Sequence, residues 1–142
     1  MKTYDLYLLD NGEDVSVSLR LTGNAIKQLE NDVRFGKVSA GEIMKLGMDR
    51  ISCTMAILDK ALNFKGNENK VKDGESLFDL LAENGYGGET NIVRLVIEIA
   101  RVSGIFSNKV CEQLYKAVEG AFDESGTENK IHAEEQVENP IS

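Results

Sequence analysis

The sequence predicts an α+β fold, mostly α, in which an N-terminal β-hairpin precedes a bundle of about five to six helices. Residues 3 to 21 alternate apolar and polar side chains around an Asn-Gly pair, which is the pattern of a hairpin. From there to residue 122, apolar residues recur mainly at helical spacing. The stretch from Thr90 to Gly104 is apolar almost all round, so other elements must wrap it. We therefore expect residues 1 to 122 to form one domain around a central helix.

The expected hairpin joins a strand at residues 3 to 9 to a second strand at residues 14 to 21. Asn11-Gly12 supplies the positive φ angles that a tight turn between two strands requires. The second strand has one apolar side and one small polar side, so one face should pack on the helices. The first strand is less cleanly divided, and its apolar residues are our candidates for a self-association or client surface: Tyr4, Leu6, Tyr7 and Leu9. The alternative, that they pack on the domain's own helices, stays open.

Four residues have the side chains and spacing of helix N-caps, namely Thr22, Ser39, Asp73 and Ser107. The first predicted helix runs to Arg34 with Val33 on its apolar side, and the last carries Val110 on its apolar side. Gly47 either breaks the second helix or is a weak point within it.

Residues 65 to 72, which lie between two predicted helices, show no periodic apolar residues, and we expect a solvated loop there.

Charge narrows the range of partners. The chain of 142 residues carries a formal net charge of −8 and has no cluster of Lys and Arg, which disfavours nucleic acid and anionic membranes. Residues 123 to 142 hold six acidic residues against Lys130 alone. Few apolar residues follow Phe122, so we expect an acidic disordered tail at residues 123 to 142.

Cysteine usage and hydropathy indicate a cytosolic protein. Cys53 and Cys111 fall on apolar faces of predicted helices without a CxxC motif, so they are expected to be reduced core thiols rather than a redox pair. Asp5 and a turn stand where a signal peptide would continue its apolar region. No apolar run is long enough to cross a bilayer.

Signatures of enzymes and metal sites are weak throughout the sequence. His132 is the only imidazole and lies in the expected tail, so no triad or His/Glu metal site can be built from it. The glycines at 85 to 88 lack the lysine and hydroxyl residue of a phosphate-binding loop. Asp79 and Glu83 are spaced as surface charges of an amphipathic helix, and residues 10 to 14 are too short for an EF-hand. We expect no enzyme activity, no cofactor and no metal.

The order of three short motifs carries a resemblance to a known family. Leu19 to Glu30 reads LRLTGNAIKQLE, Ile57 to Phe64 reads ILDKALNF, and Asp79 to Gly88 reads DLLAENGYGG. This order resembles the tail assembly chaperones of long-tailed, siphovirus-type phages and prophages of Gram-positive bacteria. The resemblance covers roughly Val15 to Val118.

The resemblance implies a small non-enzymatic protein that binds the tape measure protein and helps tail tube protein subunits polymerise around it. It also implies a homo-oligomer that works in the cytoplasm of the bacterial host and is absent from the mature virion. In related phages a frameshift appends a second domain, for which the polar segment from Asp123 would suit a tether. The family has no catalytic residues to carry over.

Three other interpretations remain open from the sequence. One is a structural tail component, such as a tube or connector subunit, although a tube protein usually needs a large β-sandwich and only one hairpin is readable here. A second is a generic helical module for protein-protein interaction. A third is an enzyme whose site is assembled in an oligomer.

Overall fold

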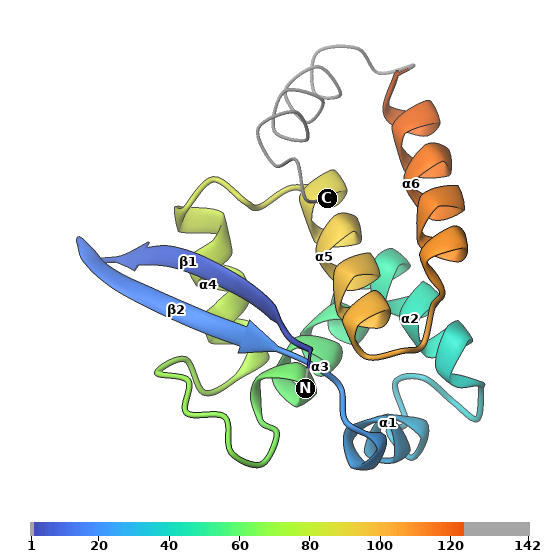
Figure 1. The fold of residues 1–142 in the computed structure, drawn as a ribbon, viewed down its shortest axis with the longest axis horizontal. Helices are drawn as coiled ribbons and strands as arrows, with labels where there is room; N and C mark the ends of the chain where they lie inside the picture. The colour runs from blue at the N-terminus through green and yellow to red at the C-terminus, as the bar shows by residue number, and fades with distance from the viewer. Residues whose placement is uncertain (1, 124–142) are drawn as a thin grey trace.

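The computed structural model describes residues 2 to 123, and they form the expected α+β fold, in which a β-hairpin is followed by six helices (Figure 1). The elements in chain order are β1 (Tyr4–Asp10), β2 (Glu13–Leu19), α1 (Gly23–Glu30), α2 (Ala40–Asp49), α3 (Ile51–Leu62), α4 (Gly74–Glu83), α5 (Glu89–Val102) and α6 (Asn108–Asp123). The expected tail at residues 123 to 142, including His132, lies outside the described residues except for its first position.

The hairpin forms as predicted. Strands β1 and β2 pair antiparallel, and the two residues between them, Asn11 and Gly12, have φ angles of 52° and 82°. Positive φ at both positions is what a tight turn of the type I′ class needs to match the twist of the strands. The face of the hairpin that carries Leu8, Val15 and Val17 is buried against the helices. The hairpin therefore has one core face and one outer face.

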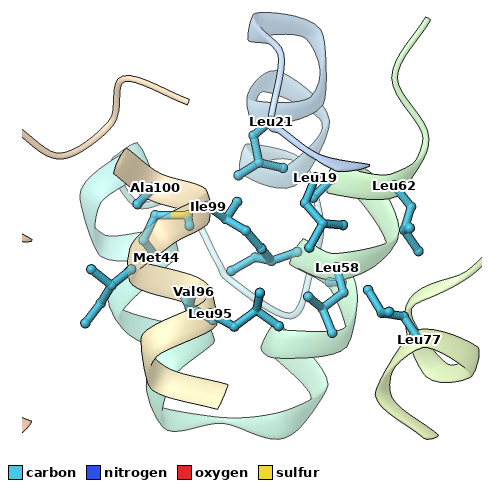
Figure 2. Close-up of a cluster of buried hydrophobic side chains, with 14 of the residues drawn as sticks. Leu19, Leu21, Met44, Leu58, Leu62, Leu77, Leu95, Val96, Ile99 and Ala100 are labelled. Carbon is cyan, nitrogen blue, oxygen red and sulfur yellow. The ribbon is translucent and has the colours of Figure 1, made fainter. Parts of the chain in front are cut away.

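Helix α5 lies at the centre of the helical part, which confirms the sequence prediction. It contacts α2, α3, α6 and β1, and Val96, Ile97, Ile99 and Ala100 have no exposed surface. Figure 2 shows Leu95, Val96 and Ile99 among side chains that come from α2, α3, α4 and the end of the hairpin. A helix this rich in apolar residues reaches its lowest free energy in this position because most of its apolar surface leaves water.

All four predicted N-caps accept a backbone hydrogen bond at the start of a helix. The amide of Ala25 donates to Thr22 Oγ1 at 3.2 Å, and that of Glu42 donates to Ser39 Oγ at 3.3 Å. The Asp73 and Ser107 side chains accept in the same way from residues three positions later. These local hydrogen bonds set where the helices begin.

The first helix is shorter than the sequence predicts, because α1 ends at Glu30 instead of Arg34. The Asp32 side chain accepts hydrogen bonds from the Arg34 backbone amide at 2.9 Å and from its guanidinium. This local bonding offers the backbone an alternative to the helix. The placement of Val33 on the apolar side is therefore wrong, since 95% of its surface is exposed.

Gly47 lies inside α2. The helix ends only at Asp49, and the extended backbone of Arg50 separates α2 from α3. A Cβ atom at Gly47 would clash with Cδ1 of the fully buried Ile57 on α3. The glycine thus lets two consecutive helices approach closely, and it does not end the helix.

Helix α6 packs mainly against α5, through buried Cys111 and half-buried Leu114, Tyr115 and Val118. Val110, which the sequence places on the apolar side, is exposed. The contact face of α6 is therefore centred nearer to Tyr115 than the apolar pattern predicts.

Candidate interaction surface

The outer face of the hairpin carries two uncovered apolar side chains. Tyr7 is 79% exposed and Leu9 is 54% exposed, and they lie two residues apart on the same side of β1. Their cross-strand neighbours on β2 are the short or polar residues Ser16 and Asp14. Together with Leu8 and Val15, these residues line an open depression. This depression is the candidate interaction surface.

The structure places the four predicted surface residues on two different faces. Tyr4 and Leu6 lie on the core face, half-buried against the hydrophobic core, whereas Tyr7 and Leu9 lie on the outer face. Side chains alternate along a strand, so these two pairs cannot share one surface. Tyr4 and Leu6 thus pack on the domain's own helices, and Tyr7 and Leu9 remain as the candidate surface.

The hairpin is acidic around this surface. Asp5 and Asp14 lie on the same face as Tyr7 and Leu9, and Asp10 and Glu13 lie at the tip. All four are exposed, and the hairpin has no Lys or Arg between residues 3 and 19. An apolar side chain that docks here therefore approaches a negative surface.

One edge of the hairpin is anchored by an asparagine from the loop between α3 and α4. Asn69 is only 6% exposed, and its Oδ1 accepts from the Ser18 amide at 3.1 Å. Its Nδ2 donates to the carbonyl oxygens of Ser18 at 3.2 Å and Leu62 at 3.1 Å. Asn67 adds hydrogen bonds to the same two carbonyls. The sequence prediction that residues 65 to 72 are a solvated loop is therefore wrong at its centre.

The other edge is anchored by Asn84 at the end of α4. Its Oδ1 accepts from the Leu9 amide at 2.8 Å, and its Nδ2 donates to the Leu9 carbonyl at 2.9 Å and to the Leu80 carbonyl at 2.8 Å. A lone two-stranded hairpin is marginal in water, so these side chains help to fix it on the helices. They hold the backbone of Leu9 in place while its side chain remains exposed.

A buried polar group joins α5 to α6. Glu98 is 8% exposed, and its carboxylate accepts from Arg101 Nε at 3.0 Å and from the Tyr115 hydroxyl at 2.5 Å. Arg94 pairs with Glu119 at 3.6 Å along the same interface. The apolar pattern of residues 90 to 104 does not predict this pairing. Arg94, Glu98 and Arg101 are spaced by four and three residues, which puts them on one helix face, and this spacing is the signal in the sequence that indicates it.

The hydrogen bonds of this polar group are made within the domain, so its role is structural. Burial, and then the hydrogen bond to Glu98, raises the pKa of Tyr115, and burial is also the main reason that the pKa of Tyr4 is raised. Both phenols therefore stay neutral and act as donors or as packing groups. The carboxylate of Glu98 is occupied by donors from its own helix and from α6.

The two cysteines are free and buried, as predicted. Burial raises the pKa of the Cys111 thiol, and Cys53 Sγ lies 3.6 Å from the carbonyl oxygen of Arg34. A nucleophilic cysteine needs the opposite conditions, a lowered pKa and access to solvent. Both thiols act as small core side chains.

Within residues 2 to 123, no group of three or more His, Cys, Asp or Glu side chains is placed to hold a metal ion. Over the same residues, no helix has the length and apolar character to span a membrane. The expectations of no metal, no cofactor and no enzyme activity stay predictions.

Protein-family models, curated proteins and solved structures were compared with the chain, and none of them matches. The resemblance to tail assembly chaperones therefore remains a prediction from short motifs.

Proposed function

We propose that this protein is a phage tail assembly chaperone, which binds the tape measure protein and assists polymerisation of the tail tube. The proposal rests on the order of motifs from Leu19 to Gly88 and on the kind of surface that the fold presents. It places the protein in the cytoplasm of the bacterial host as a homo-oligomer that leaves before the virion is complete.

The observation that carries the proposal is the uncovered pair Tyr7 and Leu9, which lie two residues apart on the outer face of the hairpin. A protein that covers the apolar helices of a long client needs exposed apolar side chains on a firm support. The support here is a hairpin whose two edges are anchored by Asn69 and Asn84.

The small size of this surface fits a coat made of many copies. Burying two large side chains contributes on the order of 3 to 6 kcal/mol before the costs of association, and 1 mM affinity already needs about 4 kcal/mol. One copy thus binds weakly, whereas many copies along one client bind with high avidity. Weak individual contacts also allow release when the tube replaces the chaperone.

Co-expression with a tape measure protein from the same genome tests the proposal. We expect the tape measure protein to stay soluble and to co-purify with the chain, and to precipitate when expressed alone. Equal precipitation with and without the chain would reject the proposal.

A structural tail component is less well supported, because the only sheet among the described residues has two strands. The two functions differ in where the protein ends up. A tube or connector subunit would be found in purified particles, and a chaperone would be found only in the lysate of the host.

A further inference from the structure

We infer that the outer face of the hairpin binds a basic segment of its client, in which large apolar side chains are flanked by Lys or Arg. The client's identity rests on the proposed function, whereas the chemistry of the segment comes from the surface itself. The inference also assigns this face to the client and not to contacts between copies of the chain.

The apolar and acidic groups of this face lie close enough to act on one partner. Asp14 is the cross-strand neighbour of Leu9, which separates their Cβ atoms by about 5 Å. Asp5 precedes Tyr7 by two residues on the same face, or about 7 Å along the strand. Both distances are shorter than the Debye length of about 8 Å at physiological salt. A side chain that contacts Tyr7 therefore feels the carboxylate of Asp5, and one that contacts Leu9 feels the carboxylate of Asp14.

The same charges disfavour two other occupants. In a symmetric contact between two copies, Asp5 and Asp14 of one hairpin would face the same carboxylates of the other, and like charges across an interface are unfavourable. Residues 123 to 142 of the chain's own sequence carry six acidic residues against one lysine, so they would be repelled as well. A partner with positive charges beside its apolar residues is the complementary choice.

The shape of the face agrees with a side chain that enters from outside. Ser16 is short and exposed and is the cross-strand neighbour of the exposed Tyr7, and both residues line the open depression. A Lys or Arg stem can pack on this ring while its charged end reaches Asp14 or Asp5.

Binding of two synthetic peptides to the full chain tests the inference. The probe is a fluorescein-labelled peptide in which leucine alternates with lysine, and its control has glutamate in place of each lysine. We expect the lysine peptide to bind with an affinity that falls as salt rises, and the glutamate peptide not to bind.

Two pairs of variants locate the binding site. Tyr7→Ser with Leu9→Ser should weaken binding of the lysine peptide by about tenfold or more, because the apolar anchors are lost. Val33→Ser with Ile51→Ser removes exposed apolar side chains elsewhere and should leave binding unchanged.

The second pair of variants tests charge. Asp5→Asn with Asp14→Asn should weaken binding several-fold and reduce its salt dependence, because two nearby carboxylates are lost. Glu30→Gln with Glu112→Gln removes the same charge at exposed positions away from the hairpin and should change neither. Circular dichroism confirms that each variant is folded.

Several outcomes would overturn the inference. Equal binding of both peptides, or an equal loss in the control variants, would show that the hairpin face is not selective for a basic segment. A fall in oligomer mass on Tyr7→Ser with Leu9→Ser, with peptide binding unchanged, would assign this face to a second copy. If the tape measure protein stays soluble with the Tyr7→Ser and Leu9→Ser variant, the proposed function stands and this surface fails. If the lysine peptide binds but the chain does not change the solubility of the tape measure protein, this surface stands and the proposed function fails.

Discussion

Replacing Asn69 by alanine should lower the free energy of unfolding by about 1 to 3 kcal/mol, although the residue lies in a loop that looks polar and solvated in the sequence. Its amide bridges the edge of β2 to the end of α3 through Ser18 and Leu62. The truncation therefore removes a connection between the hairpin and the helices, and it leaves the apolar core intact.

The magnitude follows from which groups lose their only partner. Asn67 also donates to the carbonyls of Ser18 and Leu62, at 3.0 Å and 2.8 Å, so these oxygens keep a hydrogen bond in the variant. The Ser18 amide donates to Asn69 Oδ1 at 3.1 Å, and this acceptor is lost in the variant. The Ser18 donor is only partly buried, so its loss of a partner falls in the lower part of the usual range, at about 1 to 2 kcal/mol, and the weakened bonds to the two carbonyls add about 1 kcal/mol at most.

Urea unfolding monitored by circular dichroism measures the loss, with Asn67→Ala as the matched control. Asn67→Ala should cost only about 1 kcal/mol, because both of its acceptors keep Asn69 as a donor. A loss below about 0.5 kcal/mol for Asn69→Ala would refute the reasoning and restore the interpretation of a solvated loop.

Asn69→Asp provides a second test of the same contact. The introduced carboxylate can still accept from the Ser18 amide, but it has no hydrogen to donate to the carbonyl oxygens of Ser18 and Leu62. Its stability should recover as the pH falls, since protonation of the introduced carboxyl restores one donor. In sign, burial against carbonyls raises the folded-state pKa, so the stability is present at low pH and is lost as the pH rises through that pKa. A flat pH profile relative to the parent protein would contradict this account.

Three further predictions concern packing, a buried hydroxyl and a helix cap. Gly47→Ala should destabilise the protein by about 1 to 3 kcal/mol because the new Cβ meets the Ile57 side chain. The double variant with Ile57→Val should lose less stability than the two single variants lose together. Additive losses in urea unfolding would contradict this. Thr90→Val should raise the free energy of unfolding by about 1 kcal/mol, and the melting temperature by a few degrees. The reason is that Thr90 Oγ1 is buried without a hydrogen-bond partner among residues 2 to 123. A lower melting temperature would count against this reasoning. The backbone hydrogen bond from Ser76 is the main reason that the pKa of Asp73 is lowered, so the stability from this cap is present above the unfolded-state pKa and is lost as the pH falls through the folded-state value. Asp73→Asn should therefore flatten the acid side of the melting-temperature profile, and an unchanged slope would reject the assignment.

The features that the sequence predicts correctly all depend on residues close together in the chain. Asn11-Gly12 needs only its own backbone angles to form the turn, and Asp73 needs only the amide three residues later to begin α4. The central position of α5 is predictable as well, because a helix with so many large apolar residues is stable only where other elements cover most of its surface.

The errors of the sequence analysis arise where a distant partner or a competing local bond decides. Val33 continues an apolar period, but the pairing of Asp32 with Arg34 ends the helix before it. The sequence leaves open whether Gly47 breaks the helix, and only the contact with Ile57 across the turn at Arg50 decides its role.

The candidate surface also depends partly on local sequence and partly on distant contacts. The sequence by itself determined that Tyr7 and Leu9 share one side of a strand, because side chains alternate with a fixed period of two. Only the tertiary structure decided which side would be covered, since that depends on where α3, α4 and α5 lie and on the two asparagines that hold the edges of the hairpin. The physical reason is that local geometry is set by neighbouring residues, whereas exposure is set by the free energy of packing all elements together.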